Sequence, residues 1–507
     1  MNRAAGILLP ISSLPSKYGI GCFSKDAYEF VDWLKAAGQS YWQILPLVPT
    51  SYGDSPYQSF STYAGNPYFI SLEALIEEGV LTQEECDAAD LDGEDGQIDY
   101  KKQYYNRMPL LRKAYERSHV SENEAYLRFV DEQAWWLKDY ALFMSVKECF
   151  DGAAWTQWAE DIRVRYAPAM DYYREKMYYE IEFHQYLQYK FFEQWAKLKA
   201  YANANGIKII GDIPIYVAMD SADTWAHPEL FQLDEKNVPT AVAGCPPDGF
   251  SATGQLWGNP LYRWDYHQQT GYYWWLGRLD YCFKMYDVLR IDHFRGFDEY
   301  YSIPYGAETA MEGHWEKGPG MSLFYRMREV LGYREVVAED LGYMTDSVRN
   351  LVRDSGFPNM KVLEFAFDSR DSGCASDYLP HNYEENCVAY TGTHDNETIS
   401  GWLDSISDDE YKMVREYLCD EQTEKEQLYW SLIALIMRSR ANVCVVPMQD
   451  YLGLDNSCRM NQPSTVGKNW KWRVSAEQLS DELQNKIRKM IIRYGRINWQ
   501  WNDEIDL

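Results

Sequence analysis

Positive charge is scarce in this sequence. Its 49 Lys and Arg residues stand against 77 Asp and Glu residues, which gives a formal net charge of −28. Binding to nucleic acid needs clustered cations, and so does a basic anchor on an anionic membrane surface. The charge balance therefore argues against both kinds of protein, and we expect neither a nucleic acid nor a membrane as a partner.

Several short motifs of nucleotide and metal enzymes are missing as well. The chain contains no G-x-x-x-x-G-K-S/T, no G-x-G-x-x-G and no H-E-x-x-H, and it has only 8 His. A phosphate-binding-loop enzyme, a dinucleotide enzyme and a zinc hydrolase are therefore disfavoured. The 10 Cys residues show no C-x-x-C spacing, which favours reduced thiols over a disulfide scaffold or a zinc site.

Long apolar runs are also lacking. No run approaches the ~20 residues that span a bilayer. The N-terminal apolar stretch is short and broken by Pro10, so it does not read as a signal peptide. Hydrophobic residues still make up 46% of the chain, enough for a large core. We expect a folded cytoplasmic protein.

Aromatic residues, in contrast, are abundant: 42 Tyr, 19 Trp and 19 Phe. Many lie in polar stretches that contain Gly and Pro, such as 51–69 and 271–281. An aromatic ring offers a flat apolar face with a polar tip, which matches the C–H faces and hydroxyl rim of a sugar. Core filling is the alternative for any single ring, but the excess in loop-like contexts favours a carbohydrate ligand.

Eight short apolar or β-branched runs predict strands. They are 4–10, 41–47, 207–213, 287–292, 334–340, 360–365, 386–392 and 442–448. Helical patterns lie between several of them, most clearly at 24–38, 424–440 and 475–495. In the first of these helices Ser24 is the expected N-cap and Gly38 the expected end. In the last, Ser475 and Gln478 have the spacing of a capping box.

This alternation predicts an α/β fold, a parallel (β/α)₈ TIM barrel with large insertions in its βα loops. An open doubly wound sheet is the structural alternative. We expect one catalytic barrel over 1–507, with an inserted, largely helical subdomain at about 66–200 and a second insertion at about 214–286 that carries the active-site loop. Within the second insertion, the stretch 244–260 is the candidate lid.

Acidic residues end two of the central predicted strands, where the βα loops of such a barrel converge. Arg290 precedes Asp292 by two residues, so both side chains share one face, and the arginine keeps the carboxylate ionised as a nucleophile requires. Glu339 and Asp340 alternate, so only one of them faces the mouth, and the alternation does not say which. If either motif stood alone, a purely structural ion pair would be a sufficient explanation for its charged residues.

A third acidic group follows the seventh strand. The stretch TGTHDNET supplies His394, Asp395 and Glu397, although such a segment is often only a turn. Three acids from three strand ends suit cleavage of a glycosidic bond: one protonates the leaving oxygen, one attacks the anomeric carbon, and a third holds sugar hydroxyls. In a retaining enzyme the first two carboxyl groups lie roughly 5–5.5 Å apart.

In its motifs the chain resembles the 4-α-glucanotransferases of the amylomaltase, or disproportionating-enzyme, type, in glycoside hydrolase family 77 of the α-amylase clan. The resemblance covers nearly the whole chain. It rests on SPYQSFSTYAGNPYFISLE, GDIPIYVAMDSADTW, GQLWGNPLY, LRIDHFRGF, AEDLG, TGTHDNET and MNQPSTVGKNWKWR. Together these motifs are highly specific, whereas any single one is weak.

The resemblance implies roles for individual residues. Asp292 matches the nucleophile, Glu339 rather than Asp340 matches the general acid/base, and Asp395 matches the third acid. Tyr57 matches a ring that stacks on a sugar. The full set of implied substrate-binding residues is Tyr57, Asp212, Trp257, Asn259, Arg290, Asp368, His394 and Asn461.

Two positions depart from the pattern. α-Amylases usually have an Asn-His pair after the aspartate of their first motif, whereas here Ile213 and Pro214 follow Asp212. This departure fits the transferase branch and argues against a calcium site, so we expect no metal and no cofactor. Ser464 stands where the family more often has glycine, and a glycine there could adopt a positive φ.

The implied activity is that of a 4-α-glucanotransferase. Such an enzyme transfers an α-1,4-glucan segment, with retention, from a maltooligosaccharide or starch donor to the 4-hydroxyl of glucose or another glucan. A hydrolase of the same clan would use the same acids. The alternatives from other classes are a non-catalytic glucan-binding protein and a phosphohydrolase whose activity a metal chelator would abolish.

Overall fold

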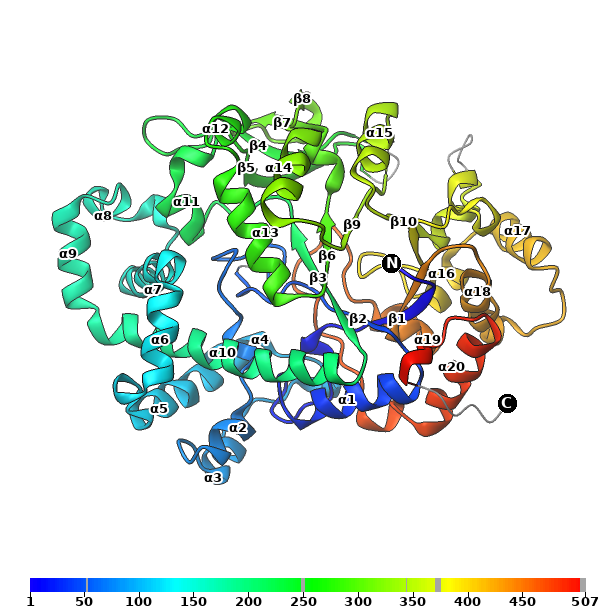
Figure 1. The fold of residues 1–507 in the computed structure, drawn as a ribbon, viewed down its shortest axis with the longest axis horizontal. Coiled ribbons are helices and arrows are strands. Elements are labelled where there is room, and N and C mark those ends of the chain that lie inside the picture. The colour runs from blue at the N-terminus through cyan, green and yellow to red at the C-terminus, as the bar shows by residue number, and fades with distance from the viewer. Residues whose placement is uncertain (52, 248–250, 343, 370–374, 502–507) are drawn as a thin grey trace.

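Eight short parallel strands close into a barrel at the centre of the molecule (Figure 1). The computed structural model describes residues 1–51, 53–247, 251–342, 344–369 and 375–501. Around the ring the order is β1-β12-β11-β10-β9-β6-β3-β2. The strands are β1 Ala4–Leu8, β2 Tyr41–Gln43, β3 Lys208–Pro214, β6 Val288–Asp292, β9 Val336–Ala338, β10 Asn359–Val362, β11 Cys387–Tyr390 and β12 Val443–Pro447. The predicted (β/α)₈ barrel is confirmed, and the closed ring excludes an open sheet.

The barrel interior is filled by alternate residues of the strands. One apolar cluster takes side chains from all eight: Ala4, Leu8, Tyr41, Ile210, Val288, Val337, Met360, Val362, Val388, Tyr390, Val443 and Val445. Their neighbours, such as Leu289, Val336 and Ala338, pack outward into the larger core beneath the helices. Because successive side chains of a strand point to opposite faces, this parity decides which strand-end residues face inward.

The helices lie outside the ring of strands (Figure 1). Those before β3 are α1 Lys25–Ala36, α2 Leu72–Glu77, α3 Gln83–Asp87, α4 Tyr100–Lys102, α5 Met108–Ser118, α6 Glu124–Glu132, α7 Ala134–Cys149, α8 Glu160–Arg163, α9 Ala167–Lys176 and α10 Tyr178–Ala204. Those after β3 are α11 Ala222–Ala226, α12 Trp264–Gln269, α13 Tyr273–Met285, α14 Met321–Leu331, α15 Asp346–Ser355, α16 Ile399–Ser405, α17 Asp408–Leu418, α18 Leu428–Met437, α19 Met448–Tyr451 and α20 Asp481–Arg493.

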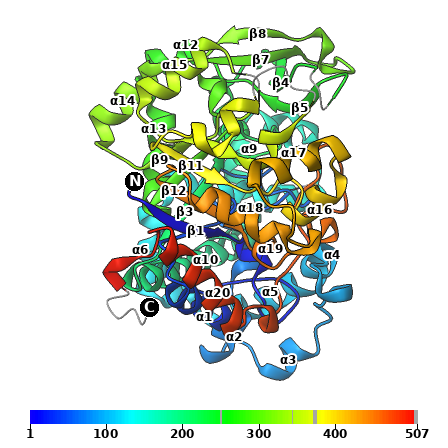
Figure 2. The same ribbon diagram turned by 90° about the vertical axis from the view of Figure 1, so that its right-hand side faces the viewer.

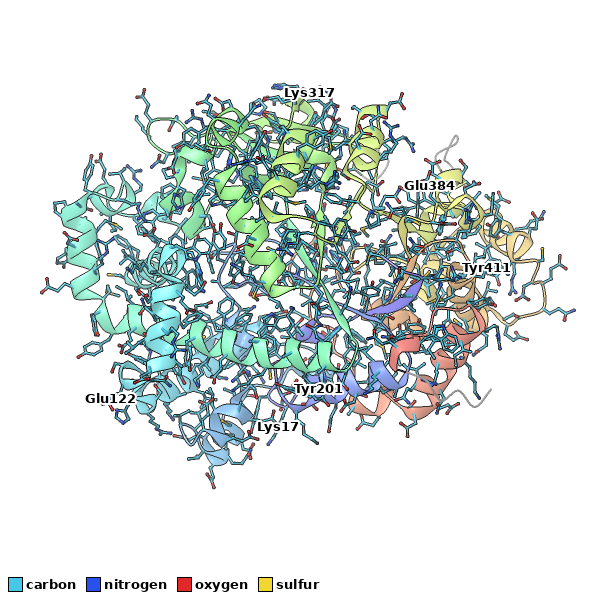
Figure 3. The ribbon with its side chains drawn as sticks, viewed as in Figure 1. Lys17, Glu122, Tyr201, Lys317, Glu384 and Tyr411 are labelled. Carbon is cyan, nitrogen blue, oxygen red and sulfur yellow. The ribbon has the colours of Figure 1, made fainter. Side chains whose placement is uncertain are left out.

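The long connection between β2 and β3 is largely helical. Its helices α6 to α9 lie at one side of the molecule, away from the barrel (Figure 1). The last helix, α10, has 27 residues and runs back to the barrel, where it packs against α1. The Tyr201 hydroxyl, labelled in Figure 3, donates a hydrogen bond of 2.7 Å to Asp32 of α1. A helix that returns in this way supplies the crossover that parallel neighbours need.

A second sheet of four antiparallel strands was not predicted from the sequence. Its order is β5-β4-β7-β8, with β4 Ala241–Cys245, β5 Gln255–Pro260, β7 Glu299–Pro304 and β8 His314–Lys317. The sheet lies at one end of the molecule, opposite α2 and α3 (Figure 2). The candidate lid 244–260 therefore includes the end of β4 and all of β5, and its residues 248–250 lie outside the described residues.

The expected N-cap position of the first helix is confirmed, whereas two details of the predicted helices differ in the structure. Ser24 is the N-cap of α1 but makes no capping bond; its hydroxyl lies 2.8 Å from the Ser16 hydroxyl instead. The pattern 475–495 is two elements. The capping box of Ser475 and Gln478 forms, but it caps a 3₁₀ helix, Ala476–Gln478, whereas α20 begins after a second cap, Ser480. The sequence SAEQLS contains two serines that can each act as an N-cap. The helix propensities of the residues between them do not indicate that the helix is interrupted there.

Charged side chains of both signs are exposed at the surface. The labelled side chains Lys17, Glu122, Lys317 and Glu384 lie around the outline of the molecule (Figure 3). Among the described helices, none combines the length and apolar character needed to cross a membrane. The nine cysteines of the described residues are free thiols.

Candidate active site

The inward faces of β3 and β6 bring three charged residues to the carboxyl end of the barrel. Asp212 pairs in register with Arg290, and Pro214 pairs with Asp292. Ile210 and Val288 fill the interior, so Asp212, Arg290 and Asp292, which continue the same parity, also face inward.

Arg290 holds two carboxylates at once. Its Nη1 donates to Asp212 Oδ2 at 2.6 Å, and its Nη2 donates to Asp292 Oδ1 at 2.9 Å. Arg290 is 3% exposed and Asp212 has no exposed surface. Burial opposes the charge of the guanidinium, but the two carboxylates raise the pKa of Arg290 well above its ordinary value. The arginine therefore stays charged and fixes the orientation of Asp292.

Asp292 is the more exposed member of this group. Burial raises the pKa of its carboxyl to about 6 against the opposing effect of Arg290, and the negative charges of Asp212 and Asp395 add to the rise. At neutral pH the carboxylate is ionised, and its Oδ1 accepts a hydrogen bond from Arg290. This state suits a nucleophile.

Glu339 lies on the neighbouring strand. Arg290 pairs with Val337 and Ile291 pairs with Ala338, so the next position along β6 and β9 brings Asp292 beside Glu339. Val337 belongs to the barrel interior, and the same parity turns Glu339 inward. Asp340 turns outward, where its carboxylate accepts a hydrogen bond of 3.0 Å from the Met360 amide.

The Glu339 carboxyl is prepared to carry a proton. Burial, and next the charge of Asp292, raise its pKa to about 8, although Arg290 and two backbone hydrogen bonds oppose the rise. Those bonds come from the amides of His293, at 2.7 Å to Oε2, and Leu341, at 2.8 Å to Oε1. At neutral pH an ionised Asp292 thus stands beside a protonated Glu339, the arrangement that divides two carboxyl groups into a nucleophile and an acid.

The turn after β11 supplies a third carboxylate. Asp395 Oδ1 accepts a hydrogen bond of 2.6 Å from Asn461 Nδ2, and its Oδ2 lies 3.4 Å from His394 Nε2. The Asp395 carbonyl accepts a further bond of 2.6 Å from Arg459 Nη2. The side chain of Asp395 is 43% exposed, so the carboxylate is fixed but remains open to a ligand.

An aromatic group connects this turn with the ion pair. The Tyr57 hydroxyl donates to Asp212 Oδ2 at 2.8 Å. The Tyr57 ring stacks on His394, with centroids 5.1 Å apart and planes 14° apart, and Trp470 lies 5.9 Å away. Residues from four distant segments of the chain thus meet around Asp212 and His394.

Trp257 and Asn259 belong to β5, beside the rim. The Trp257 ring meets the His293 ring edge-on, with centroids 4.9 Å apart. Asn259 is 6% exposed; its Nδ2 donates to the Val217 carbonyl at 2.8 Å, and its Oδ1 accepts from Gln58 at 3.2 Å. Trp257 therefore presents a ring near the acids, whereas Asn259 ties β5 to the loops after β2 and β3.

The remaining candidates also differ in whether they are open to a ligand or hold other residues in place. Asp212 is wholly buried and accepts hydrogen bonds from Arg290 and Tyr57. It therefore positions these two side chains. Asp368 lies half-buried after the 3₁₀ helix Leu363–Phe367 that follows β10, at the carboxyl end of the barrel. Ser464 itself adopts the positive φ, 64°, that a glycine would allow.

Sequence reasoning missed His293 and Arg459. His293 has a left-handed backbone, with φ 54° and ψ 47°, and this conformation directs its amide toward Glu339. A left-handed conformation is uncommon in a histidine and favours a functional position, but the residue type does not reveal it. Arg459 acts through a backbone carbonyl, which no sequence pattern identifies. Within the described ranges, no three His, Cys, Asp or Glu residues gather as metal ligands.

The fold and the site together define a barrel enzyme with three carboxyl groups at the carboxyl rim. The sequence profile described as 4-alpha-glucanotransferase matches residues 9–479. The chain therefore belongs to the 4-alpha-glucanotransferase family, whose members transfer glycosyl groups.

Individual relatives match this chain over nearly their full lengths. The chain is 47% identical to a 4-alpha-glucanotransferase of Clostridium butyricum over 96% of this chain and 99% of that one. It is 46% identical to that of Thermus thermophilus, over 97% and 98%. Among solved structures, an amylomaltase from Streptococcus agalactiae in complex with acarbose superposes with a TM-score of 0.94 at 41% identity, covering 98% of this chain and 100% of that chain. The expected family is confirmed.

Proposed function

We propose that this enzyme transfers α-1,4-glucan segments between maltooligosaccharides by a retaining, two-step mechanism. The observation that carries the proposal is the pair on adjacent strands: Asp292, ionised and held by Arg290, beside Glu339, which keeps its proton at neutral pH. A retaining glycosyl transfer requires one ionised and one protonated carboxyl group in that relation.

In the first step Asp292 attacks the anomeric carbon of the donor glucan. Its Oδ1 is engaged by Arg290, so we assign the attack to Oδ2. The bond from the anomeric carbon to the 4-oxygen breaks as Glu339 protonates that oxygen, and the shortened glucan leaves. A covalent glycosyl-enzyme remains on Asp292.

In the second step the 4-hydroxyl of glucose or of another glucan attacks the same carbon. Glu339 accepts the hydroxyl proton, the new α-1,4 bond forms, and Asp292 returns as a carboxylate. The charge of Asp292 raises the pKa of Glu339 in the free enzyme. Because ester formation removes that charge, the pKa of Glu339 falls in the intermediate, as a base requires.

The surrounding residues support these steps by position. Asp395, oriented by Asn461 and Arg459, faces the site with an exposed carboxylate suited to the hydroxyls of the reacting sugar. The Tyr57 ring, fixed by Asp212 and His394, offers a platform for a sugar face. Trp257 offers a second platform on the β5 side.

The insertions have distinct parts in this proposal. We assign 66–200 to a helical subdomain beside the barrel and 214–286 to the segment that carries the active-site loop. The stretch 244–260 would shield the glycosyl-enzyme from water while an acceptor binds. Asp368 would bind a sugar hydroxyl from the loop after β10.

Product analysis from maltotriose tests the activity. We expect glucose together with maltotetraose, maltopentaose and longer chains, while the number of reducing ends stays constant, because every bond broken is matched by one formed. A hydrolase of the same clan would instead raise the number of reducing ends. An unchanged substrate would indicate a non-catalytic glucan-binding protein and would contradict the proposal.

The pH dependence of kcat/KM follows from the two carboxyl groups. Asp292 must be ionised, so activity falls as pH decreases through its pKa of about 6. Glu339 must be protonated, so activity falls as pH increases through its pKa of about 8. We expect a bell-shaped profile with its maximum near neutrality. A profile that keeps rising above pH 9 would contradict the assignment of Glu339 as the acid.

A further inference from the structure

A buried carboxyl group that the mechanism does not use lies beneath the turn that carries Asp395. Glu364 belongs to the 3₁₀ helix after β10 and is 7% exposed. Its Oε2 accepts a hydrogen bond of 3.2 Å from Asn396 Nδ2. Its Oε1 has no hydrogen-bond partner among the described residues and lies against Gly392. A buried polar group with so few partners costs free energy and calls for an explanation.

The hydrogen bond between Asn396 and Glu364 is the first in a short series of hydrogen bonds that ends at Asp395. Asn396 Oδ1 accepts from the Thr393 amide at 2.9 Å and from the Thr393 hydroxyl at 2.8 Å. The Thr393 hydroxyl oxygen in turn accepts from the Asp395 amide at 3.2 Å. Each bond fixes the next group in the turn, so the orientation of the Asn396 side chain decides where the Asp395 backbone lies.

We propose that Glu364 is a positioning residue for Asp395. Its carboxyl fixes the Asn396 amide group, and through Asn396 and Thr393 it holds the third acid in place from beneath. Asn461 and Arg459 hold Asp395 from the other side. This inference rests on the proposed function, because it deepens the role assigned to Asp395 there.

The surroundings explain why an acid can occupy this position without disturbing the site. Burial, and next the nearby Asp450, raise the pKa of Glu364 well above its ordinary value. Both effects disfavour the charged form of the carboxyl. What it contributes is an acceptor oxygen of fixed position, which glutamine also provides and leucine does not.

A substitution at Gly392 offers an independent way to disturb the contact between Glu364 and Asn396. A Cβ added to Gly392 would lie 2.6 Å from Glu364 Oε1 and 3.0 Å from Asn396 Cβ. Gly392 is not among the positive-φ glycines, so alanine fits its backbone. Gly392→Ala should therefore displace the Glu364 carboxyl without changing Glu364 itself.

The experiment compares kcat and KM for maltotriose disproportionation among variants. We expect Glu364→Leu and Gly392→Ala to lower kcat roughly 10- to 100-fold with KM changed less than about 3-fold, because a displaced catalytic group acts on the transition state. Glu364→Gln should keep kcat within about 3-fold of wild type. Leu198→Ala in α10, a fully buried core position on another element, is the control for lost stability and should leave kcat unchanged.

A double variant separates positioning from general damage. With α-maltosyl fluoride as an activated donor, Glu364→Leu should lower kcat in the wild-type background but not in Asp395→Asn, because the group that Glu364 positions is already lost. Equal losses in both backgrounds would overturn the inference, and so would a Glu364→Gln variant as impaired as Glu364→Leu. If Glu364→Leu does not fold, Gly392→Ala carries the same comparison.

The outcome for the mechanism is distinguishable from the outcome for Glu364. If Asp395→Asn keeps the wild-type kcat, the role of the third acid is wrong and the positioning inference falls with it. If Asp395→Asn is impaired while Glu364→Leu and Gly392→Ala behave as Leu198→Ala does, only the inference about Glu364 is wrong.

Discussion

Asp292→Asn is expected to lower the rate of glucan transfer by about 10⁴-fold or more, the scale seen when a covalent nucleophile is removed. Asparagine has nearly the shape of aspartate and can still accept the hydrogen bond from Arg290 Nη2, which lies 2.9 Å from Oδ1. The amide cannot attack the anomeric carbon, so no glycosyl-enzyme forms. Chain-length analysis of maltotriose products measures the loss, and circular dichroism with thermal unfolding checks the fold.

Asp287, next to the same strand, provides a control. It lies immediately before β6, at the amino end of the barrel, where it accepts hydrogen bonds from Asn203 and the Ile209 amide. That end of a (β/α)₈ barrel contributes stability rather than chemistry. Asp287→Asn should lower the melting temperature with little effect on kcat. Near-normal transfer by a folded Asp292→Asn protein would refute the assignment of the nucleophile.

Glu339→Gln is expected to lower transfer from maltotriose by about 10²–10⁴-fold, the usual contribution of a general acid/base. The loss should depend on the donor. α-Maltosyl fluoride has a leaving group that needs no proton, so Asp292 should still be glycosylated, and the intermediate should accumulate because its acceptor lacks a base. Mass spectrometry would detect one added maltosyl group on the peptide that contains Asp292.

Azide extends this test, because it attacks without losing a proton. Added azide should restore turnover of the fluoride by Glu339→Gln and give an α-glycosyl azide. Asp340→Asn is the matched control: its carboxyl is adjacent in sequence but turned outward to the Met360 amide. Asp340→Asn should stay within a few-fold of wild type. If it were the more impaired of the two, the acid/base assignment would be wrong.

The barrel strands were visible in the sequence because they are buried on both faces. Parallel strands of this kind form continuous apolar runs, such as 442–448, and each is closed by a polar or glycine-containing turn. The antiparallel sheet left no such signal. Its strands β4 and β5 contain Gly244 and Gly258, β5 and β7 end in Pro260 and Pro304, and β7 pairs with β4 far away in sequence. Tertiary pairing, rather than local preference, forms this sheet.

The candidate acids were predictable for a different reason. Side-chain alternation placed Arg290 with Asp292, and the structure joins them by a hydrogen bond. The choice between Glu339 and Asp340 needed the family resemblance, although Val337 in the barrel interior gives the physical reason. Alternation alone does not set the absolute orientation of a strand; the packing of its neighbours does.

The roles of some other residues in the site could not be predicted from their residue types. His293 acts through a backbone amide in a left-handed conformation. Glu364 lies in the apolar-looking run MKVLEF, where a single acid resembles a solvent-facing strand position. Both depend on where the turns after β6 and β11 lie in space, which the sequence does not encode locally.

The closure of the ring has a consequence for synthesis of the protein. β1 pairs with β12, the first and last strands of the barrel, and the site combines Tyr57 with Trp470. A chain emerging from the ribosome therefore keeps β1 unpaired on that side until β12 has been translated, and no catalytic rim exists before then. Folding that waits for such distant partners is slow and leaves the edges of the early strands unpaired in the meantime.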